Sequence, residues 1–139
     1  DVLVKPHPRA SSVADIEAVI NLARRDSRLL LTDANVHDML AASCVSVSIN
    51  STVALEEFLH QTPAILYGKS DFHHMAENVT QLGGFTTALE RALQRRGGYA
   101  QYLTWYFRHN CLAIGADDLE SQIWYIFETA GFGRDHFAN

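Results

Sequence analysis

Long apolar runs are missing from the sequence, and cysteine is scarce. No stretch approaches the roughly 20 apolar residues of a membrane-spanning helix, and no signal peptide is visible. The two cysteines, Cys44 and Cys111, are too few for a disulfide framework, and neither belongs to a CxxC motif. This usage is typical of a chain from a reducing cytoplasm. The absences argue against an integral membrane protein and against a small disulfide-stapled fold.

Positively charged residues are fewer than negatively charged ones. Lysine and arginine total 11 against 16 aspartate and glutamate residues, so the formal net charge is −5. This balance argues against broad nucleic-acid binding and against a basic membrane-surface domain, but it leaves room for one local anion pocket. The 139 residues are 47% hydrophobic and 19% charged. They therefore predict one globular domain, or part of a larger one, with a core that needs no disulfides.

Several well-known catalytic motifs are absent as well. The chain has no GxGxxG and no P-loop, so hydride transfer and NTP hydrolysis lack their phosphate-binding loop. No serine lies in a GxSxG turn. Cys44 begins an apolar strand and Cys111 follows an aromatic helix, so both thiols are predicted to pack in the core rather than act as nucleophiles.

The first half of the chain alternates short apolar runs with helical patterns. This alternation predicts an α/β fold, with a Rossmann-like parallel sheet and flanking helices. Right-handed crossovers place the carboxyl ends of parallel strands at one edge, where such sheets bind ligands. The expected strands are 2–5, 28–31, 44–49 and 64–67, and the expected helices cover 16–23, 36–42 and a segment after Thr52.

The second half changes character. Residues 69–83 are polar, and helical stripes follow from Phe85, Tyr99 and Leu119. We therefore assign 1–80 to a ligand-binding core and 81–139 to a helical part of the same domain. The aromatic stripe from Tyr99 favours core packing over stacking on a sugar or lipid, although Trp105 and Phe107 fall off this stripe. That helix is thus expected to be apolar on two sides.

The segment Lys5-Pro6-His7-Pro8-Arg9 lies at the end of the first strand. Two prolines stiffen the loop, so His7 projects from a rigid frame between two cations, Lys5 and Arg9. An imidazole with two cations can clamp a phosphate. The alternative is that His7 only hydrogen-bonds a neighbouring loop.

A second candidate site follows the third strand, at Asn50-Ser51-Thr52. Hydroxyl and backbone N–H groups at a helix start can hold an anion, but plain N-capping by Asn50 or Ser51 explains the same residues. Glu56 or Glu57, just inside the helix, can accept a hydrogen bond from a ribose or sugar hydroxyl. Favourable charge near the helix start is the simpler interpretation of these two acids.

Histidine and acid residues between 71 and 77 raise the question of a metal site. His73 and Glu77 would share a face if the segment were helical. Solvated loop residues or gate residues over a ligand are the preferred interpretation, and no metal is expected. The remaining histidines show no partner in the sequence, namely His37, His60, His109 and His136.

Three blocks of sequence, in this order and spacing, resemble one bacterial family. The segments 4–9, 48–56 and 63–68 are similar to the KxHP, NSTVGLE and PVxxxG patterns of capsule polysaccharide biosynthesis proteins, the Kdo (3-deoxy-D-manno-octulosonic acid) transferases and their relatives. The match covers about residues 2–70. It departs from the pattern at Ala54, where the family usually has glycine. The chain also begins at the KPHP strand, so a preceding βα unit and the acceptor domain are expected outside it.

The resemblance implies the C-terminal, donor-binding part of a GT-B glycosyltransferase that uses CMP-Kdo in capsule or surface polysaccharide synthesis. It implies that His7 is the catalytic residue that binds the donor phosphate, that Pro8 shapes its turn and that Ser51 and Thr52 hold phosphate. Glu56, not Glu57, corresponds to the acid near the nucleotide sugar. No DxD motif is present, so no metal or other cofactor is expected, and charge on the leaving CMP would be neutralised by protein groups.

The implied partners are the nucleotide-sugar donor, a glycolipid or polysaccharide acceptor and the N-terminal domain of the same protein, and nucleic acid is not among them. The expected location is the cytoplasm, or the periphery of the inner membrane through the full-length protein or a complex. Two alternatives stay open. One is a CDP-polyol phosphotransferase of the teichoic-acid type, which uses a similar fold and histidine-proline loop. The other is a non-catalytic scaffold domain, since fold does not fix function.

Overall fold

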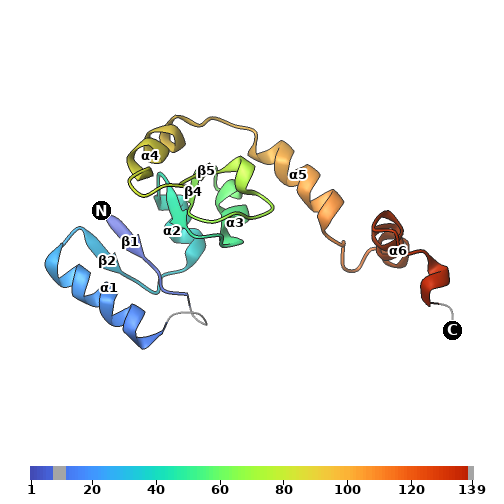
Figure 1. Ribbon diagram of the computed structural model, residues 1–139, viewed down its shortest axis with the longest axis horizontal. Coiled ribbons are helices and arrows are strands. Elements are labelled where there is room, and N and C mark those ends of the chain that lie inside the picture. Colours follow the sequence, from blue (N-terminus) through green and yellow to red (C-terminus); the bar gives the residue numbers. More distant parts are fainter. Residues whose placement is uncertain (8–11, 138–139) are drawn as a thin grey trace. The chain divides into compact units, whose positions relative to one another are not determined.

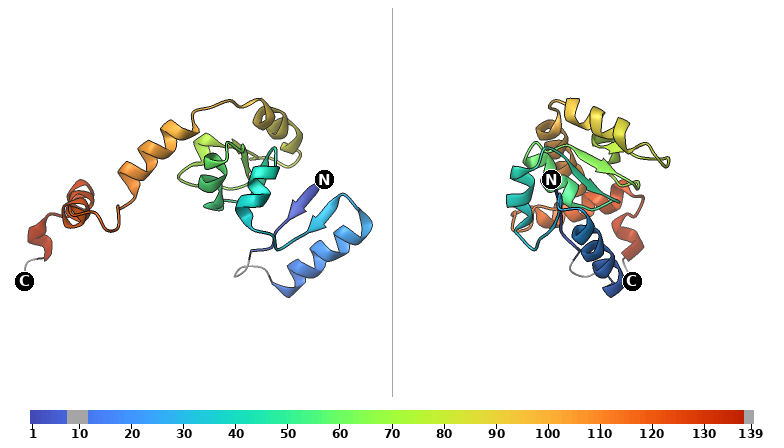
Figure 2. Two further views of the ribbon diagram at one scale, coloured as in Figure 1. Left: turned by 180° about the vertical axis from the view of Figure 1, so that it is seen from behind. Right: turned by 90° about the vertical axis from the view of Figure 1, so that its left-hand side faces the viewer.

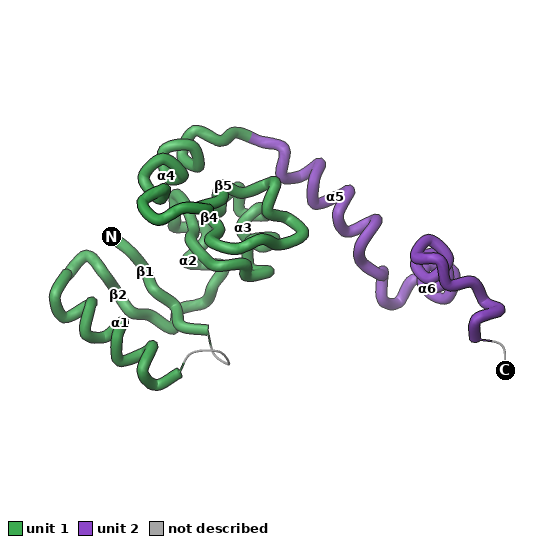
Figure 3. Tube along the Cα trace, viewed as in Figure 1, with its two compact units in different colours: residues 1–96 green, residues 97–139 purple. Residues whose placement is uncertain are grey.

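The computed structural model describes residues 1–7 and 12–137, and the chain divides into two compact units (Figures 1 and 3). The first unit spans 1–96 and holds every described strand. The second spans 97–139 and is helical. Pro8 and Arg9 of the expected phosphate clamp lie outside the described residues.

A parallel strand pair opens the first unit. Strand β1 (Val2–Val4) pairs with β2 (Leu29–Leu31), and the connecting helix α1 (Val13–Arg25) packs against β2 (Figure 2). Helix α1 begins at Ser12 because of a reciprocal cap. The Asp15 backbone N–H donates to the Ser12 hydroxyl at 3.1 Å, and the Ser12 backbone N–H donates to the Asp15 carboxylate at 3.0 Å.

A second, three-stranded parallel sheet has the order β3-β4-β5. Its central strand β4 pairs on both sides, and all three of its residues are buried. Ile65 of β4 packs with Val79, Ala88 and Ala92 in the core. The elements of this part are α2 (Val36–Ala42), β3 (Ser46–Ser48), α3 (Val53–Leu59), β4 (Ala64–Leu66), the 3₁₀ helix η1 (His73–Met75), β5 (Glu77–Asn78) and α4 (Phe85–Gln94).

These elements confirm an α/β protein with parallel sheets flanked by helices. The strands were expected to share one sheet edge, but they form two sheets. Within residues 1–7 and 12–137, no strand pairing joins β1–β2 to β3–β4–β5. Strand β5 was not expected, since two polar residues carry no strand periodicity. Helix α4, assigned from the sequence to the C-terminal helical part, packs on β4 and β5 and lies in the first unit.

The second unit contains α5 (Tyr99–Asn110), α6 (Leu119–Thr129) and the 3₁₀ helix η2 (Arg134–Phe137). Tyr99, Tyr102 and Leu103 are buried, whereas Trp105 and Phe107 are 51% and 44% exposed. The expected division between a buried stripe and an outward apolar side of α5 is therefore confirmed. Among the described residues, no helix is both long and apolar enough to cross a membrane.

The prediction that both cysteines lie in the core is wrong. Cys44 and Cys111 are free thiols and both are exposed. Cys44 precedes β3 instead of forming part of it, and Cys111 is the C-cap residue of α5. Each thiol thus sits just outside the element that was expected to bury it.

Candidate functional site

The Asn-Ser-Thr segment forms the turn between β3 and α3. The Ser51 hydroxyl accepts a hydrogen bond from the Val53 N–H at 3.3 Å, which stabilises the turn, but Ser51 is not the N-cap residue that was expected. Thr52 is the N-cap residue, but its hydroxyl makes no capping bond and the residue is exposed. Asn50 is exposed as well. The turn therefore presents polar side chains to solvent at the point where α3 begins.

Gly68, just after β4, lies against this turn and bonds to it. The Tyr67 and Gly68 N–H groups donate to the carbonyl oxygens of Ser48 and Ile49, at 3.0 and 2.7 Å. A Cβ atom on Gly68 would lie 3.2 Å from the Ile49 oxygen, closer than an ordinary van der Waals contact. Glycine at this position lets the exit of β4 approach the turn after β3 closely.

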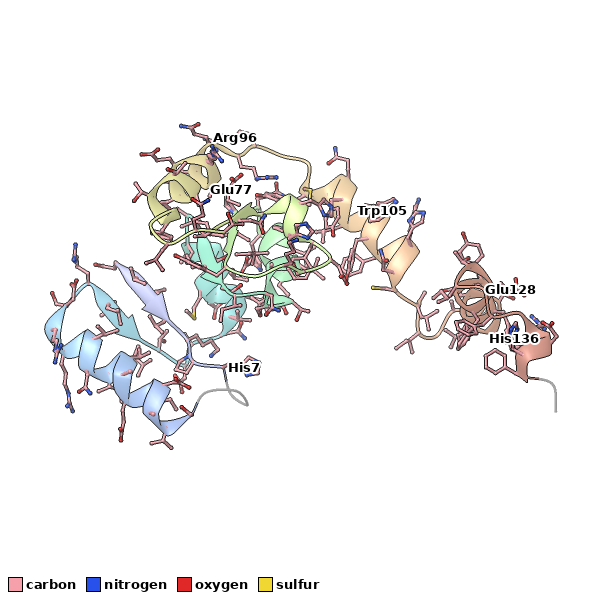
Figure 4. The ribbon with its side chains drawn as sticks, viewed as in Figure 1. His7, Glu77, Arg96, Trp105, Glu128 and His136 are labelled. Atoms are coloured by element: carbon pink, nitrogen blue, oxygen red, sulfur yellow. The ribbon has the colours of Figure 1, made fainter. Side chains whose placement is uncertain are left out.

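Lys5 has a structural role at the end of β1. Its ammonium donates to the carbonyl oxygens of Asp33 and Ala34, at 3.0 and 2.7 Å, which ties β1 to the loop before α2. An ammonium has three N–H donors, so one donor stays available for an anion. His7 follows β1 as an exposed side chain (Figure 4).

Glu56 lies in the first turn of α3, and its partner is a residue that sequence reasoning missed. The Nε2 atom of His37, on α2, lies 3.4 Å from the Glu56 carboxylate, and the Nδ1 atom of His37 lies 3.1 Å from the Nε2 atom of His60. Glu56 lies in α3 and His60 is its C-cap residue four positions later, a spacing that brings the two side chains to the same side of the helix. That spacing was the available signal, but it does not reveal His37.

Glu57 has a different environment from its neighbour Glu56. Glu57 is only 3% exposed, and in the part of the chain that the structure describes its Oε2 atom makes no hydrogen bond. Burial raises the pKa of the Glu57 carboxyl to about 7. The nearby Ser46 hydroxyl lowers this pKa and the charge of Glu56 raises it further. Glu57 is thus an internal acid, and Glu56 is the acid that faces solvent.

The residues between 71 and 78 do not form the helical metal face that was considered. His73 lies in η1 and Glu77 lies in β5, so the helical spacing does not apply. A ring nitrogen of His73 contacts the Ser70 carbonyl oxygen, and Glu77 pairs with Arg95 at 3.4 Å. Within residues 1–7 and 12–137, no group of three or more His, Cys, Asp or Glu side chains is placed to hold a metal ion.

The expected site residues fall into two sets. Lys5 and His7 follow β1 in one sheet, and 50–56 follow β3 in the other. Helix α2 connects them, because Lys5 bonds the loop at its start and His37 in its first turn contacts Glu56. The link between the two sets therefore runs through α2 and not through strand pairing.

The fold and these turns define an α/β protein of the class whose ligands bind beyond the carboxyl ends of parallel strands. A family model described as capsule polysaccharide biosynthesis protein matches residues 1–84, more than half of the chain. The chain belongs to this family, which confirms the resemblance seen in the sequence and supports a role in capsule synthesis. No curated protein and no solved structure matches the chain significantly.

Proposed function

We propose that this chain is the donor-binding part of a glycosyltransferase that uses a CMP-activated sugar, CMP-Kdo, in capsule or surface polysaccharide synthesis. The single observation that carries the proposal is the family match over residues 1–84. That span includes the KPHP strand end, the Asn-Ser-Thr turn and Glu56. We place the enzyme in the cytoplasm or at the periphery of the inner membrane, with a glycolipid or polysaccharide as acceptor.

The chemistry requires stabilisation of the departing CMP. The bond between the anomeric carbon of the sugar and the phosphate oxygen breaks, the acceptor hydroxyl oxygen bonds that carbon, and the hydroxyl proton passes to a general base on the acceptor side. Negative charge grows on the phosphate as CMP leaves. His7 would donate a hydrogen bond to this phosphate, acting as the catalytic residue, and the hydroxyls of Ser51 and Thr52 would add two more.

Three features support this assignment of roles. His7 is exposed, so its ring can reach a ligand. The Thr52 hydroxyl is exposed and is not used to cap α3. Glu56 is 41% exposed at its side chain and lies in the first turn of α3, where it would accept a hydrogen bond from a hydroxyl of the ribose or of the transferred sugar. Lys5 has one ammonium donor left to face the phosphate.

The experiment is a calorimetric panel of CMP, CDP, UMP, UDP and GDP with the 139-residue chain and two variants. We expect CMP to bind most tightly and His7→Ala to weaken CMP binding about tenfold, the value of one hydrogen bond to a charged group. His109→Ala is the matched control, because it removes an exposed imidazole whose ring contacts the Trp105 carbonyl oxygen within α5. Unchanged CMP affinity in folded His7→Ala contradicts the assigned role.

The other outcomes separate the competing functions. A preference for CDP, or for CDP-glycerol over CMP, would indicate a CDP-polyol phosphotransferase, whose donor carries a diphosphate. Absence of binding to every nucleotide by the folded chain would contradict the transferase proposal and favour a scaffold domain.

A further inference from the structure

His37 links helix α2, which follows the loop that Lys5 bonds, to helix α3, which follows the Asn-Ser-Thr turn. Its backbone N–H donates to the Asn35 side-chain oxygen at 2.8 Å, so the N-cap of α2 fixes its position in the first turn. Lys5 holds the preceding loop through the carbonyl oxygens of Asp33 and Ala34. These bonds fix the backbone of His37 at the start of α2.

The ring of His37 lies between Glu56 of α3 and His60, the C-cap residue of that helix. Its Nε2 atom faces the Glu56 carboxylate at 3.4 Å, and its Nδ1 atom faces the Nε2 atom of His60 at 3.1 Å. The two imidazole centroids are 5.3 Å apart. Helices α2 and α3 also pack against each other, which keeps His37 of α2 close to Glu56 of α3.

The donor and acceptor properties of the three side chains limit the direction in which hydrogen bonds can run between them. An ionised carboxylate only accepts hydrogen bonds, so a hydrogen bond from the neutral ring of His37 to Glu56 requires the proton on Nε2. The Nδ1 atom of His37 is then an acceptor, and His60 donates to it from Nε2. In that tautomer, donation would run from His60 through His37 towards Glu56, whose nearer carboxylate oxygen lies 3.4 Å from His37 Nε2, and the other carboxylate oxygen would be left for a ligand.

We propose that His37 is a positioning residue that holds the Glu56 carboxylate in the orientation that accepts a hydroxyl of the bound nucleotide sugar. The proposal rests on the function proposed above, because Glu56 needs that ligand to act on. His37 does not contact the ligand in this scheme. It acts by donating from Nε2 and by restricting the rotamers of Glu56, whose side chain is otherwise 41% exposed to solvent.

Two conservative substitutions separate the two contacts of the ring. The amide nitrogen of glutamine takes nearly the place of histidine Nε2, and that of asparagine takes nearly the place of Nδ1. His37→Gln therefore keeps a donor for Glu56. His37→Asn keeps a side-chain amide near His60, where the amide oxygen can replace the Nδ1 acceptor, and has no donor that reaches Glu56. Because the His37 side chain is 53% exposed, both variants and His37→Ala are expected to fold, which circular dichroism verifies.

The first measurement is calorimetric binding of CMP and of freshly prepared CMP-Kdo. We expect His37→Ala and His37→Asn to bind at least one of these ligands about tenfold more weakly than the wild type, and His37→Gln to recover most of the loss. An effect already seen with CMP assigns the hydroxyl to the ribose, and an effect seen only with CMP-Kdo assigns it to the transferred sugar. His109→Ala again serves as the control.

Two results would overturn the role of His37. One is wild-type affinity in His37→Ala, and the other is a His37→Gln variant as weak as His37→Ala. The second measurement needs no ligand: nitrogen chemical shifts of the ring report which nitrogen is protonated, and we expect Nε2. Protonation at Nδ1 in the neutral ring would refute the scheme. A wild-type chain that binds neither ligand refutes the proposed function instead, which keeps the two failures distinct.

Discussion

The buried carboxyl of Glu57 makes the stability of the first unit depend on pH. Glu57 lies inside the fold with 3% of its surface exposed, and burial raises its pKa from 4.5 to about 7. In the unfolded chain the carboxyl is solvated and loses its proton near 4.5. Between these two values the folded state binds more proton than the unfolded state, so the free energy of unfolding falls as pH rises.

The size of this effect follows from the two pKa values. The contribution of Glu57 is fully present below about pH 4.5 and is lost progressively as pH rises through about 7. The complete loss corresponds to about 3 kcal/mol, since each factor of ten in proton affinity is worth about 1.4 kcal/mol. Because a domain of this size is stable by only about 5–15 kcal/mol, such a change is easily measured.

Glu57→Gln tests the reasoning, because the amide has nearly the same shape and cannot ionise. We expect the variant to be more stable than the wild type by up to about 3 kcal/mol at pH 8, and the advantage to shrink towards pH 5. Urea unfolding at several pH values gives both curves. Glu17→Gln, which removes an exposed carboxylate of α1, controls for the loss of one negative charge. A constant difference between wild type and Glu57→Gln across pH 5–8 would refute the assignment.

Two further substitutions probe the local geometry. Gly68→Ala places a Cβ atom 3.2 Å from the Ile49 oxygen, so we expect the free energy of unfolding in urea to fall by about 1–3 kcal/mol and CMP binding to weaken. A variant with unchanged stability and binding would show that the turn after β3 adjusts to the extra atom. Ser12→Ala removes the cap of α1 and is expected to cost about 1 kcal/mol, with Ser27→Ala as the control. In the same variant the lowered pKa of Asp15 should rise towards 3.8, which carboxyl NMR titration measures, because the Ser12 hydroxyl no longer donates to its carboxylate and only the backbone N–H of residue 12 does.

The sequence predicts the elements of the first unit well, because their signals are local. The helix expected at 36–42 has those bounds in the structure, and strands at 2–5, 28–31, 44–49 and 64–67 all contain observed strands. Strand β5 escapes prediction because it is two residues long and takes its position from pairing with β4. The exposure of Cys44 and Cys111 was not predicted, because both residues were treated as parts of buried elements. Cys44 lies two residues before β3, and Cys111 lies one residue after α5.

The site is predictable where it follows strand ends and unpredictable where it depends on helix packing. His7 and the Asn-Ser-Thr turn are both found from the pattern of strands and breaks. The contact of His37 with Glu56 joins positions 19 residues apart and exists only because α2 packs on α3. The burial of Glu57 is equally non-local. Two adjacent acids near a helix start look alike in the sequence, and only the packing of α3 distinguishes the exposed acid from the internal one.

The pairing of β4 on both sides has a consequence for hydrogen exchange. The amides of β4 are buried and bonded within a three-stranded ladder, so they are expected to exchange only through openings that disrupt the β3-β4-β5 sheet. The Asn-Ser-Thr turn is tied to the exit of this strand through the Tyr67 and Gly68 N–H groups. Strand β1 pairs only with β2 among the residues that the structure describes, so it is expected to open at lower free energy. The two parts of the proposed phosphate site therefore differ in local stability, with a slowly opening turn at 50–52 and a more readily opened strand before His7.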